Sequence, residues 1–131
     1  MKSSYMFDTH ALIFWNLKKG VSNEFIEFFD EQSDKGNVLV SAISFWEMAL
    51  LSKKGRIEIA DVELWKSDLT KNTGIGIVTP EASEMIASVY LPEIHKDPFD
   101  RLLIVQANRH NAMLVTKDEL IKAYSVEVFW V

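Results

Sequence analysis

The chain alternates between short apolar runs and longer stretches in which apolar residues recur every three or four positions. Short runs of apolar and β-branched residues, bounded by turn residues, are typical of strands buried on both faces. Runs of this kind predict strands at Ser4–Phe7, Val38–Ser41, Gly74–Val78, Met113–Val115 and around Val126–Val131.

The stretches between these runs predict helices, because their apolar residues fall on one side of a helical period. The helices are expected at Thr9–Leu17, from Ser22 to the turn at 34–37, and at Ile43–Lys54, Asp61–Asn72, Glu81–Tyr90, Pro98–Arg109 and Glu119–Ala123. Strands that alternate with helices favour a mostly parallel sheet covered on both faces. We therefore expect a single α/β domain over residues 1–131, a three-layer α/β/α sandwich around about five strands.

Composition narrows the class of protein. The chain has 131 residues, of which 48% are apolar, enough for one domain with a buried core. It contains no cysteine, which excludes disulfides and thiolate zinc sites. No apolar stretch approaches the roughly 20 residues that span a membrane, and Asp8 and His10 interrupt the first apolar run, so no signal peptide is expected. These features predict a soluble, cytoplasmic protein without membrane attachment.

The formal net charge of −5 argues mildly against nucleic acid as a ligand, because phosphate binding is typical of basic surfaces. The objection weakens if several acids bind metal ions, since bound cations cancel their charge locally. It also weakens if a basic partner binds the domain. The positions of the acids are therefore more informative than their number.

Three acids have a local setting that calls for an explanation. Asp8 and Asp118 each follow a predicted strand, where a side chain can cap the next helix or reach a ligand at the carboxyl edge of the sheet. Glu47 lies inside an otherwise apolar helical stretch, and a buried carboxylate must be paired, protonated or metal-bound. The alternative is that this helix has a narrow wet face formed by Ser44, Glu47 and Met48.

The segment Asp97-Pro98-Phe99-Asp100 places two further acids at the start of one helix. Asp97 followed by Pro98 is the preferred arrangement of an N-cap and a first helical residue. Asp100 falls at the third helical position, where a carboxylate also interacts well with the helix dipole. Asp97 therefore has a structural explanation, and Asp100 is the preferred ligand if this helix packs beside the first strand.

Taken together, Asp8, Glu47, Asp100 and Asp118 suggest a site for a hard divalent cation. Mg²⁺ and Mn²⁺ prefer oxygen ligands and keep several waters. Such a site can polarise a phosphate and lower the pKa of a bound water. The sequence contains neither a P-loop nor a GxGxxG motif that would favour a nucleotide-binding site instead.

Other polar residues close to these acids have more than one interpretation. Thr9 and Thr116 lie one and two residues from the candidate ligands Asp8 and Asp118, and can bond a ligand or a water, or cap a helix or turn. Arg101 is expected to contact either a nucleic-acid phosphate or a nearby acid. The histidines lack HExxH or similar spacing and are interpreted as surface or packing residues: His10, His95 and His110.

Four segments resemble, in order, the motifs of PIN-domain nucleases of the VapC toxin type. They read YMFDTHAL, VSAISFWEMA, DPFDRLLIVQA and VTKD, and they occupy Tyr5–Leu12, Val40–Ala49, Asp97–Ala107 and Val115–Asp118. One of these motifs alone is a weak signal. The ordered set spans nearly the whole chain and is a strong one.

The resemblance implies a PIN fold and an endoribonuclease that hydrolyses RNA with Mg²⁺ or Mn²⁺. By motif, the acids that hold the metal and carry the reaction are Asp8, Glu47, Asp100 and Asp118, with Asp97 as an additional acid. The resemblance also implies a toxin of a type II toxin–antitoxin module. Its partners would then be a cognate antitoxin and a second copy of the chain in a homodimer.

Two other functions stay open at this point. A phosphoryl-transfer or signalling domain would use a strand-end aspartate as phosphoacceptor, but Asp8 has no acid two residues further on. The third predicted strand, moreover, ends at Val78-Thr79-Pro80 without an aspartate. A non-catalytic PIN-like binding module is the second alternative, and the intact set of acids argues against it.

Overall fold

The computed structural model describes residues 2–131, and Met1 lies outside the described residues. The strands are β1 (Ser4–Phe7), β2 (Val38–Ser41), β3 (Gly76–Val78), β4 (Ala112–Val115) and β5 (Val128–Phe129). The helices are α1 (Thr9–Leu17), α2 (Asn23–Asp34), α3 (Ala42–Lys53), α4 (Val62–Asn72), α5 (Ala82–Val89), α6 (Pro98–Arg109) and the short 3₁₀ helix η1 (Ile121–Ala123). Within this described part, none of the helices has the length and apolar character needed to cross a bilayer.

All five strands pair in parallel, in the order β3-β2-β1-β4-β5. The central strand is β1, because the chain adds β2 and β3 on one side of it and β4 and β5 on the other. Phe7, the last residue of β1, is in register with Val40 and Val115, so three strands end at the same edge of the sheet. In open α/β sheets, ligands bind at the carboxyl edge where the winding direction reverses.

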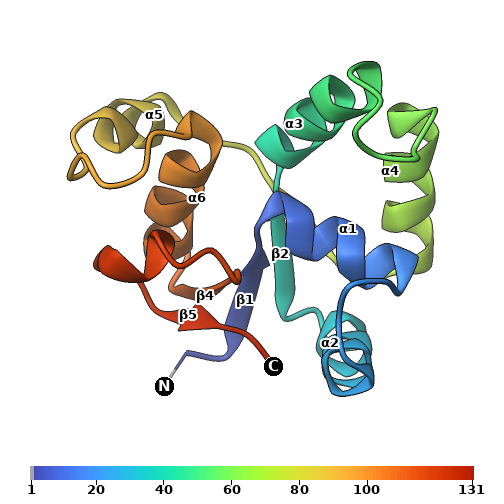
Figure 1. Ribbon diagram of the computed structural model, residues 1–131. Helices are drawn as coiled ribbons and strands as arrows, with labels where there is room; N and C mark the ends of the chain where they lie inside the picture. Colours follow the sequence, from blue (N-terminus) through green and yellow to red (C-terminus); the bar gives the residue numbers. More distant parts are fainter. Residues whose placement is uncertain (1) are drawn as a thin grey trace.

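Helices cover both faces of the sheet, with α1, α2 and α4 on one side and α5 and α6 on the other (Figure 1). Successive side chains of a strand point to opposite faces. Accordingly, Met6 belongs to the core that includes α6, while Phe7 belongs to the core that includes α1 and α2. The three-layer α/β/α sandwich expected from the sequence is confirmed.

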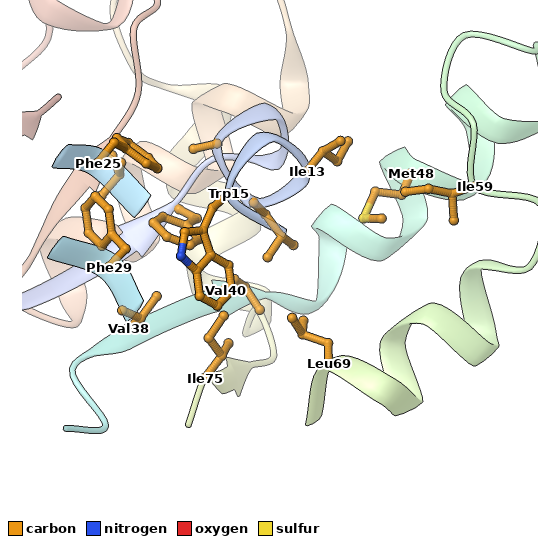
Figure 2. Packing of buried hydrophobic residues seen from close by; sticks show 14 residues of the cluster. Ile13, Trp15, Phe25, Phe29, Val38, Val40, Met48, Ile59, Leu69 and Ile75 are labelled. Carbon is orange, nitrogen blue, oxygen red and sulfur yellow. The ribbon is translucent and has the colours of Figure 1, made fainter. Parts of the chain in front are cut away.

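The core on the α1 and α2 side contains a cluster of aromatic rings among aliphatic side chains (Figure 2). The ring of Phe29 lies 4.9 Å from that of Phe7 and 4.7 Å from that of Phe25, measured between ring centroids. Trp15 closes this group on the α1 side, 5.7 Å from Phe7. Helix α2 therefore anchors the end of β1, the strand that leads directly to Asp8.

The predicted strand at Gly74–Val78 is two residues too long, because β3 begins at Gly76. Gly74 instead lies against the end of α2, where its amide donates to the Ser33 hydroxyl at 3.2 Å. A Cβ on Gly74 would lie 2.0 Å from the Ser33 carbonyl oxygen, so this close contact requires glycine. The predicted helix at Glu119–Ala123 is reduced to η1, and the last strand to Val128–Phe129.

Replacing Gly74 with alanine should destabilise the protein by about 2 to 3 kcal/mol, because the new methyl group meets backbone that cannot move aside. Gly76→Ala is the matched control, since a Cβ there lies 3.1 Å from the flexible Leu39 side chain. Urea unfolding of both variants measures the difference. Equal unfolding midpoints for Gly74→Ala and wild type would contradict this account of β3.

Candidate functional site

The structure brings the acids from four separate segments to one cavity of about 400 Å³ at the carboxyl edge of the sheet. The site acids, as we call them below, are the carboxylates that line this cavity: Asp8, Glu47, Asp97, Asp100 and Asp118. Other residues that line it are His10, Phe14, His95 and Lys117. The cavity is therefore strongly acidic, with basic groups only at a few points of its wall.

Asp8 follows β1 directly and is also the N-cap of α1. One of its oxygens accepts a hydrogen bond from the Ala11 amide at 2.8 Å, and its own amide donates to the Val115 carbonyl at 3.1 Å. Burial raises the pKa of Asp8, whereas hydrogen bonds from Thr116 and Ala11 act in the opposite direction. Capping fixes the carboxylate in place, while its position beside β4 directs it into the cavity.

Glu47 reaches the cavity from α3. Burial raises the pKa of Glu47, the Thr9 hydroxyl lowers it, and the charge of Asp97 raises it further. Its Oε1 atom is buried and has no hydrogen-bond partner among residues 2–131. The alternative of a wet face formed by Ser44, Glu47 and Met48 is wrong, because Ser44 and Met48 are fully buried and the Ser44 hydroxyl is hydrogen-bonded to the Thr9 hydroxyl at 3.0 Å.

Asp97 and Asp100 divide the two roles predicted for the start of α6. Asp97 is the N-cap, with Oδ1 accepting from the Phe99 amide at 2.9 Å, and Pro98 opens the helix. Asp100 points into the cavity with little exposure to solvent. Burial raises the pKa of Asp100 to about 7, and the neighbouring charges of Asp97 and Asp8 contribute to the shift.

Asp118 completes the set from the loop after β4. Its Oδ1 accepts from the Leu120 amide at 2.9 Å, and its own amide donates to the Thr116 hydroxyl at 3.1 Å. Thr116 is fully buried and therefore supports both Asp118 and Asp8. This double contact links the two acids that follow neighbouring strands.

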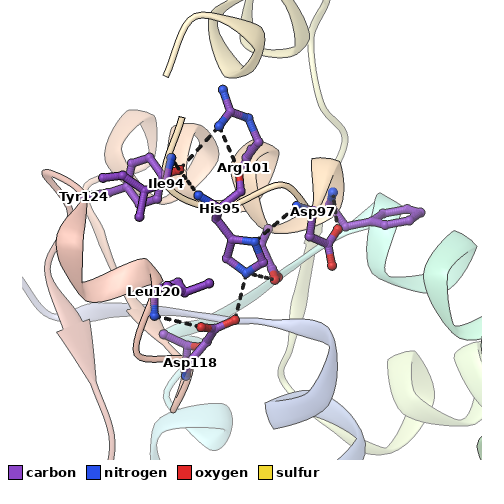
Figure 3. Close-up of polar contacts among 10 residues, drawn as sticks. Ile94, His95, Asp97, Arg101, Asp118, Leu120 and Tyr124 are labelled. Atoms are coloured by element: carbon purple, nitrogen blue, oxygen red, sulfur yellow. Dashed lines mark hydrogen bonds and ion pairs between the residues drawn. The ribbon is translucent and has the colours of Figure 1, made fainter. Parts of the chain in front are cut away.

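His95 is a site residue that the sequence analysis missed. Its Nε2 atom lies 2.8 Å from Asp118 Oδ2 and 3.0 Å from Asp100 Oδ2 (Figure 3). The interpretation of the histidines as surface or packing residues is wrong for His95, and His10 also lines the cavity. Spacing motifs could not find His95, because its carboxylate partners are brought to it by folding. Its position two residues before Asp97 was the available signal.

Arg101 does not have the role expected of it. Its side chain is buried and donates hydrogen bonds to backbone carbonyls at distances of 2.9 to 3.1 Å. The acceptors lie at the end of α5 and in the loop that follows: Ser88, Val89, Leu91, Pro92 and His95. Contact with RNA phosphate or with an acid is therefore ruled out as its main role, because its donors are already used inside the fold.

A family model described as PIN domain matches residues 5–127 of the chain, nearly its whole length. The chain belongs to the PIN domain family. It is 29% identical over 128 residues to Ribonuclease VapC22 of Mycobacterium tuberculosis, covering 93% of this chain and 92% of that protein.

Solved structures show the same PIN fold. VapBC2 from Rickettsia felis, bound to a DNA fragment from its promoter, matches with a TM-score of 0.69 at 18% identity and covers 95% of both chains. FitAcB from Neisseria gonorrhoeae matches with a TM-score of 0.66 at 17% identity, over 95% of this chain and 96% of that chain. At these identities the likeness establishes the fold of this PIN domain and not its activity.

The donor chemistry of this PIN domain fits a hard divalent cation. The cavity offers carboxylate oxygens from several segments, and Glu47 Oε1 is a buried acceptor with no donor among residues 2–131. Potential ligand atoms of His95, Asp100 and Asp118 lie within 4.8 Å of one another. Because burial disfavours the charged forms of Asp8, Glu47 and Asp100, a cation would stabilise these three acids in the ionised state.

Asp100→Asn should make the metal-free protein more stable at pH 8. The raised pKa of about 7 means that folded Asp100 keeps its proton above the pH at which the unfolded chain loses it. The contribution of protonated Asp100 to the stability of the folded protein is therefore fully present below about pH 4. It decreases as the pH rises and is lost once the pH has passed through about 7. We expect Asp100→Asn to gain about 1 to 3 kcal/mol at pH 8 and little at pH 4, where the unfolded chain also keeps much of its proton.

The measurement is thermal or urea unfolding in EDTA at both pH values. Asp68→Asn is the charge-matched control, since Asp68 is exposed on α4 and lies outside the cavity. A gain of the same size for Asp68→Asn would mean that net charge, and not the buried carboxyl group, is the cause.

Proposed function

We propose that this PIN domain is a metal-dependent endoribonuclease that hydrolyses RNA phosphodiester bonds with Mg²⁺ or Mn²⁺. The observation that carries the proposal is the meeting of Asp8, Glu47, Asp100 and Asp118 in one cavity at the reversal point of the sheet. The name of the VapC22 relative, a ribonuclease, supports the same activity. We extend the assignment to all of residues 1–131 as a single domain.

The site acids would hold the cation, with Asp8 fixed by α1, Asp100 by α6, Asp118 by its turn and Glu47 by α3. A bound divalent cation would polarise the phosphate, lower the pKa of a water and offset charge on the leaving oxygen. The remaining task of the protein is to hold the RNA strand in place beside these acids.

Lys117 is placed to bind the RNA backbone. Its Nζ atom lies 5.0 Å from the Phe14 ring centroid and 5.7 Å from that of Trp130, on the wall of the cavity. These aromatic faces hold the ammonium group close to the site acids by cation–π contact. A phosphate bound at the acids would therefore have a fixed positive charge nearby, which counters the unfavourable net charge of −5.

The same proposal includes the toxin role, in the cytoplasm, and a cognate antitoxin as partner. A toxin–antitoxin complex from Klebsiella pneumoniae is among the solved structures with this fold, at a TM-score of 0.64. A basic antitoxin segment would complement the acidic cavity. A homodimer would in turn cover exposed apolar side chains of α3 and of the end of α5, among them Trp46 (63% exposed) and Tyr90 (82% exposed).

RNA cleavage by the purified, antitoxin-free protein should require Mg²⁺ or Mn²⁺ and should stop in EDTA. Asp8→Asn and Asp118→Asn should each lower the cleavage rate by at least about 100-fold, because each removes a charged metal ligand. Asp68→Asn, at an exposed position of α4 outside the cavity, is the control and should cleave at the wild-type rate. RNA bound but never cut by the wild type would favour a non-catalytic binding module.

The affinity for Mg²⁺ should rise with pH up to about 7 and then level off. Burial and the nearby acids raise the pKa of Asp100 to about 7, so the cation must displace a proton from this site at lower pH. With one proton released, the dissociation constant should fall about tenfold per pH unit between pH 5.5 and 6.5. Calorimetric titration in two buffers of different ionisation enthalpy measures both the affinity and the proton release. A pH-independent affinity would contradict the assignment of Asp100 as a ligand.

A further inference from the structure

His95 lies in the loop between α5 and α6 and makes polar contacts through both ring nitrogens. Its Nδ1 atom accepts a hydrogen bond from the Asp97 amide at 3.1 Å. Its Nε2 atom lies between the carboxylates of Asp100 and Asp118, at 3.0 and 2.8 Å (Figure 3). The side chain is only 12% exposed, so this arrangement belongs to the interior of the site.

These contacts determine the tautomer of the imidazole ring. A backbone amide can only donate, so Nδ1 must present its lone pair to Asp97. The neutral ring then carries its proton on Nε2, which makes Nε2 a donor to Oδ2 of Asp118, with Oδ2 of Asp100 close to the same N–H group. A nitrogen that carries a proton has no lone pair for a metal. To act as a ligand through Nε2, His95 would have to give up its bond to Asp97.

Two buried side chains, Arg101 and Tyr124, form hydrogen bonds with the backbone of the loop that carries His95 (Figure 3). The Tyr124 hydroxyl accepts from the His95 amide at 2.7 Å and donates to the Pro92 carbonyl at 2.8 Å. Arg101 donates to the His95 carbonyl at 3.0 Å. The backbone of His95 is therefore fixed on both sides, and the ring is held where it meets the acids.

We propose that His95 is a positioning residue that holds Asp100 and Asp118 together for the cation without itself binding it. The inference rests on the metal site of the proposed function. The Nε2–H group hydrogen-bonds Oδ2 of Asp118 at 2.8 Å and lies 3.0 Å from Oδ2 of Asp100, so its partial positive charge is shared by both carboxylates and limits their separation. Asp118 Oδ1 is fixed in the same way by the Leu120 amide. Arg101 and Tyr124 contact neither acid, but they fix the backbone of His95 and so the position of its ring.

His95→Phe and His95→Gln separate this role from simple packing. Phenylalanine fills the space but cannot donate to the acids, whereas the glutamine amide reaches a similar distance and keeps a donor. Removing hydrogen bonds that orient metal ligands typically weakens metal binding by 10- to 100-fold. We therefore expect a loss of about that size for His95→Phe and a change of only about threefold or less for His95→Gln, measured by Mg²⁺ calorimetry at pH 8.

A second measurement determines which nitrogen of the His95 ring carries the proton. Long-range ¹H–¹⁵N spectra of the wild type should show His95 protonated at Nε2 both without Mg²⁺ and at saturating Mg²⁺. Tyr124→Phe should give an intermediate loss of Mg²⁺ affinity, because it releases the His95 backbone but leaves the ring intact. If His95→Phe fails to fold, the spectra of the wild type and the Tyr124→Phe titration still decide the question.

Three results would overturn the proposal. Loss of the Nε2 proton when Mg²⁺ binds would make His95 a ligand. Tighter Mg²⁺ binding by His95→Phe than by the wild type would mean that the ring competes with the cation. Wild-type Mg²⁺ affinity in both His95→Phe and His95→Gln would mean that His95 is only a packing residue. The same measurements separate this proposal from the proposed function. If Mg²⁺ binding by the wild type and the two variants follows the expected order but the wild type cuts no RNA, the nuclease function fails and the role of His95 stands. If the wild type binds neither Mg²⁺ nor Mn²⁺, both fail.

Discussion

Repulsion among buried carboxylates is the constraint on which the site depends. The five site acids line one cavity, and burial disfavours the charge of Asp8, Glu47 and Asp100. Carboxylates in such a setting stay together only if protons, hydrogen-bond donors or cations offset their charge. The raised pKa of Asp100, about 7, is the first of these devices, and the His95 N–H group is the second. A divalent cation would be the third and the strongest.

The sheet supplies the framework that makes this crowding possible. Because β1 lies between β2 and β4, the residues that follow it are within reach of segments on both sides. The amide of Asp8 bonds to the carbonyl of Val115, which ties the ends of β1 and β4 together. The aromatic core under Phe7 then fixes β1 from one face, and α6 packs on the other. Asp8 is thus carried by a strand that is packed on both faces.

Local patterns were sufficient to predict the architecture and the individual acids. Periodicity placed every helix to within about two residues, although the last one is a 3₁₀ helix, and the Asp97-Pro98 pair identified an N-cap that the structure confirms. What local patterns could not show is contact between distant residues. His95 meets Asp118 across 23 positions, and no spacing rule relates the two. Arg101 was misread for the same reason, since its carbonyl partners come from the end of α5 and a loop.

Capping a helix and binding a cation are compatible roles for one carboxylate, although the sequence offers them as alternatives. An ionised carboxylate has two oxygens with about four acceptor positions, and an N-cap occupies one of them. Asp8 uses one oxygen for the Ala11 amide, and Asp118 uses one for the Leu120 amide. The hydrogen bond to the backbone amide removes rotational freedom from the side chain before any ligand binds.

The helix dipoles also favour the site. Because α1 and α6 both begin at the cavity, the positive ends of their dipoles face the acids and lower the free-energy cost of bringing the acids together. The features that start these helices are therefore the same features that prepare the site.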